Sequence, residues 1–81
     1  TVVLDYELPW PAWAHLTVYD ILGRPVRQLV RSPQVAGTYR QAWDGRDAHG
    51  VPVASGIYHA VLAVEAPPHN ERRTVRLVLL R

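Results

Sequence analysis

The residues of this 81-residue sequence that could do chemistry are its seven acids and four histidines, because it contains no cysteine. Without thiols the chain has no disulfide, no thiolate-bound zinc and no cysteine-based catalytic centre. Hydrolysis by carboxylates needs two of them close together across a cleft, and the candidate pairs are Asp5 with Glu7 and Asp44 with Asp47. The first pair is typical of the wet side of a strand. We therefore predict that this domain is not an enzyme.

The loop Asp44–Gly50 is the best candidate for a metal site. Asp44 and Asp47 lie three residues apart in a glycine-containing loop, where carboxylates and backbone carbonyls can converge on Ca²⁺. An EF-hand loop needs oxygen ligands at alternate positions, which Arg46 and Ala48 occupy here. Asp side chains also hold turns by accepting hydrogen bonds from nearby backbone N–H groups. The sequence favours such turns and no cofactor, with Ca²⁺ at Asp44 and Asp47 as the alternative.

The four histidines are scattered along the chain, and no two of them have close ligand spacing. His15 and His59 fall on expected strands and could meet across a sheet. Two imidazoles without a third ligand make a poor zinc site. We therefore expect ordinary surface or half-buried histidines.

Three tryptophans in 81 residues suggest an aromatic surface for sugars. Trp43 ends an expected strand beside a tight turn, and we predict that it is in the core. Trp10 and Trp13 flank Pro11, where strand alternation does not dictate burial. They could form a platform on which sugar rings stack, and polysaccharide would then be the partner. The sequence favours a simple cap over the end of the fold.

The elements that position these residues follow from a period-two alternation of apolar and polar side chains. After Ser32 and Pro33 we expect a loop through Gly37, and residues 51–54 form at most a very short strand. Short strands separated by turn residues, without a helix, predict an antiparallel β-sandwich of immunoglobulin or fibronectin-III type with about seven strands. A small closed barrel is the lesser alternative. The expected strands cover residues 2–8, 14–19, 26–30, 38–43, 51–54, 56–65 and 72–80.

Composition limits the classes of function further. The chain is 48% hydrophobic and 20% charged, which is typical of a folded domain. Its nine basic residues, all arginine, are spread along the sequence without the basic stripe of a nucleic-acid binder. No apolar run approaches the ~20 residues of a membrane helix. We expect one domain, residues 1–81, and because Thr1 is not an initiator methionine, we expect it to be a processed or excised piece of a longer protein.

Four segments form a family pattern, in this order: 16–26 (LTVYDILGRPV), 36–39 (AGTY), 43–47 (WDGRD) with Gly50, and 53–58 (VASGIY). Their order and spacing cover nearly the whole chain. They resemble the immunoglobulin-like domain of the flagellar hook-capping family. They are also similar to the C-terminal sorting domains of secreted bacterial enzymes, the type IX secretion class.

The last expected strand favours the sorting domain, because it resembles the basic and apolar terminal strand of that class. The resemblance implies that residues 1–81 are the non-catalytic C-terminal module of a longer secreted protein, such as a glycoside hydrolase or peptidase. A secretion or cell-envelope apparatus at the bacterial cell surface would recognise this module. A flagellar hook-assembly domain is a third possibility, after the carbohydrate-binding module. The residues that match the terminal strand are Arg72, Arg73, Arg76 and Arg81, with Val75, Leu77 and Leu79 on its apolar side.

Overall fold

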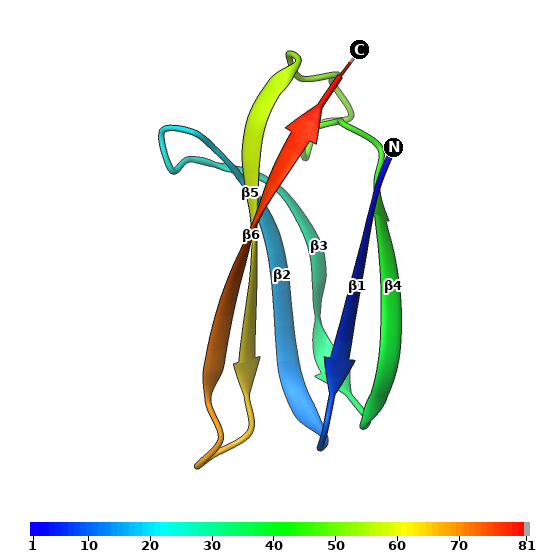
Figure 1. Cartoon of the computed structure of the whole chain (residues 1–81), viewed down its shortest axis with the longest axis vertical. Helices are drawn as coiled ribbons and strands as arrows, with labels where there is room; N and C mark the ends of the chain where they lie inside the picture. Colours follow the sequence, from blue (N-terminus) through cyan, green and yellow to red (C-terminus); the bar gives the residue numbers. More distant parts are fainter. Residues whose placement is uncertain (81) are drawn as a thin grey trace.

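The computed structural model describes residues 1–80, which fold into two antiparallel β-sheets facing each other (Figure 1). The smaller sheet has the strand order β1-β4, and the larger has the order β3-β2-β5-β6. The predicted helix-free β-sandwich is confirmed over these residues. The strands are β1 (Val2–Leu8), β2 (Ala12–Asp20), β3 (Pro25–Gln34), β4 (Gly37–Trp43), β5 (Gly56–Glu65) and β6 (Glu71–Leu79).

The described residues contain six strands rather than about seven, because residues 51–54 form no strand. Pro52 makes only an isolated bridge to Arg46. A proline has no N–H to donate to a ladder, so a strand centred on Pro52 has little to gain from pairing. No helix within residues 1–80 is long and apolar enough to cross a membrane.

The core lies between the sheets and follows the predicted alternation. On β2 and β5 every second side chain is buried, as with Leu16 and Leu62. Trp43, at the end of β4, is completely buried as predicted, and its Nε1–H donates to the carbonyl of Arg46 at 3.0 Å. Its indole contacts the ring of Tyr58 edge-on, with ring centroids 5.2 Å apart. Trp43 thus joins the smaller sheet to the larger one.

Strand β3 extends from Pro25 to Gln34, although the sequence predicts a strand that ends at residue 30 and a loop after Pro33. The structure pairs Pro33 with Trp13 of β2. β3 is an edge strand, and an edge strand tolerates proline because one of its sides needs no ladder donor. The predicted strand end at residue 30 is therefore wrong, and so is the predicted loop at Gln34.

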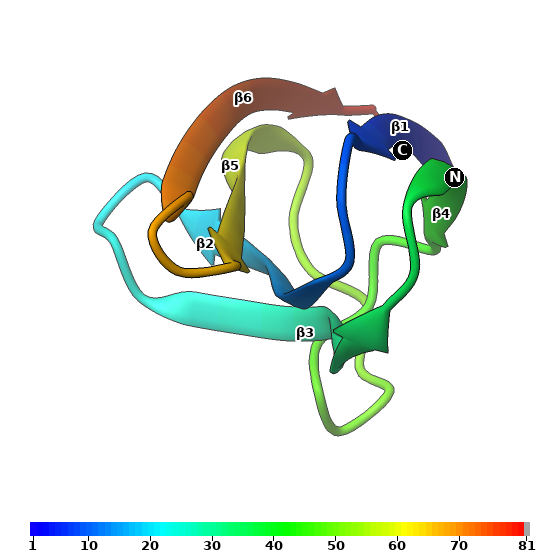
Figure 2. The same cartoon turned by 90° about the horizontal axis from the view of Figure 1, so that it is seen from below.

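The two sheets differ in width, and this leaves one side of the sandwich open. Among the described residues, β1 pairs only with β4, and β6 pairs only with β5. The free edges of β1 and β6 face each other across this side (Figure 2). They come closest where β1 begins and β6 ends, and they separate towards the other end of the sandwich (Figures 1 and 2).

Candidate interaction surface

Strand β6 forms the exposed edge of the larger sheet and carries the residues predicted for recognition. Leu77 and Leu79 point inward and are 5% and 4% exposed. Val75, on the same side of the strand, is 52% exposed because the smaller sheet does not reach it. The three residues therefore share one face as predicted, but only two of them belong to the core.

The basic side chains of β6 divide into a paired and an unpaired set. Arg73 donates through Nη2 to Oε1 of Glu71 at 2.9 Å and lies on the inner side of the strand. Arg72 and Arg76 are exposed on the outer side, and neither has an ion-pair partner among residues 1–80. Arg81 lies outside the described residues. The unpaired Arg72 and Arg76 make this edge the candidate contact for an acidic partner surface.

Trp10 and Trp13 are both partly exposed, at 38% and 37%, and each ring has its own neighbour. The Trp10 ring lies against His69 of the β5–β6 loop with centroids 4.1 Å apart. The Trp13 ring projects from the outer side of β2 and contacts His15, with centroids 5.7 Å apart. The positions of the two rings do not distinguish a cap over the end of the fold from a platform for sugars. Both therefore stay predictions.

The loop Asp44–Gly50 uses its carboxylates to hold turns. Oδ1 of Asp44 accepts the N–H of Arg46 at 3.1 Å. Oδ1 of Asp47 accepts the N–H groups of His49 at 2.8 Å and Val51 at 3.0 Å. The hydrogen bond from the backbone N–H of Val51 is the largest cause of the lowered pKa of Asp47, because it stabilises the charged carboxylate. The predicted turns held by Asp44 and Asp47 are confirmed, while Ca²⁺ at these two residues stays a prediction.

The histidines do not gather into a cluster. His15 and His59 both lie on the outer face of the larger sheet, but His59 pairs in register with Tyr19 and His15 with Ala63. Nε2 of His15 lies 3.6 Å from Oε1 of Glu65. Residues 1–80 contain no group of three His, Asp or Glu side chains that could hold a metal ion.

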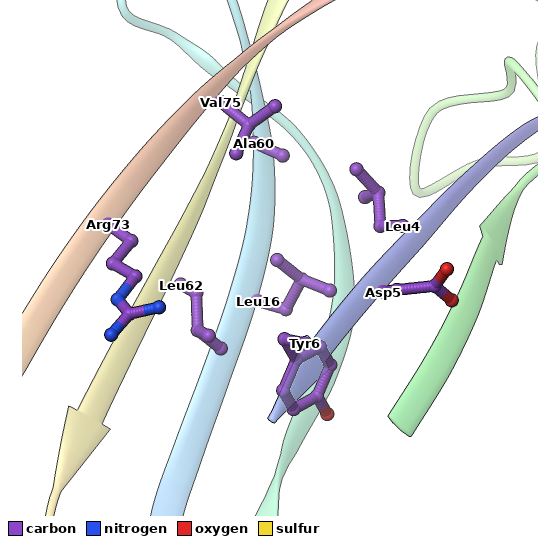
Figure 3. A pocket seen from close by; sticks show the side chains of 8 residues that line it. All are labelled: Leu4, Asp5, Tyr6, Leu16, Ala60, Leu62, Arg73 and Val75. Carbon is purple, nitrogen blue, oxygen red and sulfur yellow. The ribbon is translucent and has the colours of Figure 1, made fainter. Parts of the chain in front are cut away.

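A groove of about 160 Å³ on the open side of the sandwich was not predicted from the sequence. Side chains of Leu4 and Tyr6 on β1 point towards Leu16 and Leu62, while Val75 lines the β6 side (Figure 3). The individual strands could be predicted from their alternation. The groove could not, because it depends on how many strands each sheet receives.

Residues 1–80 thus form an immunoglobulin-like β-sandwich whose edge strands are exposed. Residues 1–66 match the family of FlgD Ig-like domains, and the chain belongs to this family. The flagellar hook-capping part of the resemblance is thereby confirmed, whereas the type IX part receives no support. The match covers β1 to β5 and stops before β6.

The structure is similar to the crystal structure of FlgD from P. aeruginosa, with a TM-score of 0.75 and 23% sequence identity. The similarity covers 94% of this chain and 60% of that chain. At this identity it establishes the fold, an immunoglobulin-like β-sandwich. No curated protein matches the sequence.

Proposed function

We propose that this domain is a non-catalytic protein-binding module that acts in flagellar hook assembly. The observation that carries the proposal is the family match over residues 1–66, which includes five of the six strands. The structural similarity to FlgD covers 94% of the chain and so includes residues beyond the family match. The function itself is the one that the resemblance to the hook-capping family implies, and the main prediction from the sequence, a sorting module, becomes the second candidate.

The placement of the acids supports a module without catalysis. Asp5 is bound by Arg40, whose Nε lies 2.9 Å from Oδ1. Asp44 and Asp47 hold backbone turns, and no polar or charged residue within residues 1–80 is buried. Carboxylates that are exposed and already paired in this way lack the perturbed, water-excluded surroundings that acid-base catalysis uses.

The test is co-sedimentation of the purified domain with hook filaments from the organism that encodes it. We expect the domain to sediment with the filaments, and a double variant R72E/R76E to remain largely in the supernatant. Arg31→Glu is the control, because Arg31 is also exposed and lies on β3 at the opposite edge of the same sheet. Failure of the unmodified domain to sediment with hook filaments would contradict the proposal.

One observation favours a second candidate, a sorting or attachment module at the cell surface. β6 lies outside the residues that match the FlgD family, and it presents Arg72 and Arg76 unpaired within the described chain. The parent would then be a secreted protein such as a glycoside hydrolase or peptidase, and the partner a secretion or cell-envelope apparatus. An exposed edge strand suits such recognition because it offers backbone groups for β-augmentation.

A reporter fusion in the native host tests this candidate. Deleting β6 is not suitable, because it would remove Leu77 and Leu79 from the core. The double variant R72E/R76E leaves the core intact and should abolish surface display, while Arg31→Glu should preserve it. Unchanged display of R72E/R76E would rule out recognition through these arginines. A fusion that is displayed without sedimenting on hook filaments would favour this candidate over hook assembly.

A further inference from the structure

The outer face of the larger sheet gathers polar, aromatic and basic side chains from all four of its strands. Residues that pair in register lie on the same face of a sheet, so the outward positions form rows across the strands. The rows are Arg31, His15, Ala63 and Arg72; then Gln28, Thr17, Val61 and Thr74; then Tyr19, His59 and Arg76. No strand of the smaller sheet covers this face, because the smaller sheet packs on the other one.

A shallow depression of about 290 Å³ lies in the middle of this face. Its floor carries the short side chains of Thr17, Val61 and Ala63. Larger polar side chains stand around the floor, and they are His15, Tyr19, Gln28, Glu65 and Arg72. Hydroxyl, amide and imidazole groups both donate and accept hydrogen bonds, as sugar hydroxyl groups do. The lining therefore suits a polyhydroxylated ligand better than an apolar one.

The charges on this face select an acidic ligand. Arg31, Arg72 and Arg76 are exposed, and none of them has an ion-pair partner among residues 1–80. Within the same residues, Glu65 is the only acid that the strand register places on this face, and its Oε1 lies 3.6 Å from Nε2 of His15. Guanidinium groups bind carboxylates with two parallel hydrogen bonds. Three unpaired arginines thus fit a ligand that carries several carboxylates.

Trp13 adds an aromatic ring beside the depression. It pairs in register with Glu65, is 37% exposed and contacts the ring of His15 with centroids 5.7 Å apart. An indole offers an apolar surface to the C–H face of a sugar ring while the sugar hydroxyl groups bind elsewhere. Arginines alone would be enough to bind an acidic protein surface. The indole beside a polar depression favours an acidic sugar instead.

We propose that the outer face of the larger sheet binds an acidic polysaccharide, whose sugars carry carboxylate groups. One sugar stacks on Trp13, its neighbours place hydroxyl groups in the depression, and their carboxylates pair with Arg31 and Arg72. These two arginines lie three strand spacings apart, about 14 Å, so a chain that crosses the strands reaches both. The inference goes beyond both proposed functions and depends on neither.

Calorimetric titration of the 81-residue domain with hexamers of galacturonic acid and of mannuronic acid tests the proposal. We expect saturable binding of at least one hexamer, with NMR shifts at the backbone amides of Thr17, Ala63 and Arg72. The methyl esters of the same hexamers carry no charge. They should bind at least about tenfold more weakly, because they cannot form ion pairs with the arginines.

The two exposed tryptophans provide a matched pair of variants. Trp13→Ala should weaken binding of the hexamer about tenfold, because it removes the stacking surface. Trp10→Ala is the control, since Trp10 is 38% exposed but lies against His69 of the β5–β6 loop and belongs to none of the rows. We expect it to leave binding unchanged, and circular dichroism of both variants would establish that they fold.

Neighbouring arginines of β6 provide a second matched pair. Arg72→Gln should weaken binding of the charged hexamer about fivefold or more and leave the weak binding of the methyl ester unchanged. Arg73→Gln is the control, because Arg73 lies on the inner side of β6 and pairs with Glu71 at 2.9 Å. It should not change binding of either form.

Four results would overturn the proposal. The first is the absence of saturable binding with both hexamers, and the second is equal binding of the acids and their methyl esters. The third is an equal effect of Trp13→Ala and Trp10→Ala. The fourth is a peptide of six glutamates that binds as tightly as the hexamers and is insensitive to Trp13→Ala, because the face would then recognise an acidic protein and not a sugar.

Discussion

Asp20 holds the β2–β3 turn with a single carboxylate. Its Oδ1 accepts the N–H groups of Leu22 and Arg24, both at 3.0 Å, and its Oδ2 accepts Nε of Arg24 at 2.8 Å. The hydrogen bond from the backbone N–H of Arg24 is the largest cause of the lowered pKa of Asp20. The hydrogen bond from the backbone N–H of Val51 has the same role for the lowered pKa of Asp47. Both carboxylates therefore connect local turn geometry to the pH dependence of stability.

We predict that the domain loses stability in acid, in part through these two groups. A carboxyl group with a lowered pKa in the folded state contributes stability above its ordinary value of 3.8, and this contribution disappears as the pH falls through the lowered pKa. The free energy of unfolding should therefore fall between about pH 5 and pH 2. Asp20→Asn and Asp47→Asn should each make that fall shallower.

Urea unfolding across this pH range measures the effect. Thr74→Ser, a substitution of one exposed, uncharged side chain by another, is the control and should keep the slope of the unmodified protein. If the free energy of unfolding of Asp20→Asn depended on pH as steeply as that of the unmodified protein, the prediction would be contradicted. Ionisation of Asp20 would then make no contribution to the stability of the turn.

Gly23 supplies the backbone conformation that closes the same turn. Its φ is 81°, in the left-handed region, and its N–H donates to the carbonyl of Asp20 at 3.0 Å. A Cβ at this position would meet no atom within 4 Å, so Gly23→Ala introduces backbone strain without a clash. We predict a loss of about 1–2 kcal/mol in the free energy of unfolding.

Thermal unfolding measures this loss, since about 1 kcal/mol corresponds to roughly 4–8 °C in Tm for a domain of this size. Gly23→Asn should cost less, because asparagine tolerates the left-handed region better than alanine. An unchanged Tm in Gly23→Ala would mean that the turn adopts another conformation in solution.

At the scale of the element, β6 shows how one strand is divided between core and surface. Leu77 is 5% exposed and Val75 is 52% exposed, although both face inward. Leu77→Ala should cost about 2–5 kcal/mol, because it removes buried methyl groups and leaves a cavity. Val75→Ala should change the free energy of unfolding by about 0.5 kcal/mol or less, as expected for an exposed site. Denaturant unfolding measures both, and comparable losses would mean that the groove beside Val75 is already closed.

Alternation predicted most elements well and failed where tertiary context decides. β1 and β5 have the predicted bounds, although the run that begins at Gly56 is apolar on both of its faces. β3 is longer than predicted because Pro33 is tolerated at a sheet edge, and sequence periodicity does not identify an edge strand. Asp44 and Asp47 were recognised correctly as turn residues, since their hydrogen bonds are local in the chain.

At the scale of the whole molecule, the sequence predicts a sandwich but not how its strands divide between the sheets. The exposure of Val75 and the half-burial of Tyr6 both follow from a smaller sheet that contains only β1 and β4. Each strand satisfies its own alternation whether or not a neighbour covers it. The exposed edge of β6 could therefore be named as a candidate from the sequence, whereas the groove beside β1 could not be predicted.

The unequal sheets predict an uneven distribution of stability over the molecule. β2 and β5 are paired on both sides and buried on one face, whereas β1 is paired on one side and seals only part of the core. Local opening of β1 should cost less than global unfolding, which β2 and β5 report. We predict that amides of β1 exchange at least about tenfold faster than those of β2 and β5, equivalent to about 1.4 kcal/mol.

Hydrogen exchange followed by NMR checks this distribution residue by residue. Amides of β1 and β4 that pair with each other should form one group of intermediate protection, and those between β2 and β5 the most protected group. Leu62→Ala removes a buried side chain of the larger sheet and should lower protection in both groups together. Equal protection of β1 and β5 in the unmodified domain would contradict the prediction. It would mean that the smaller sheet opens only when the whole sandwich unfolds, despite the free edge of β1.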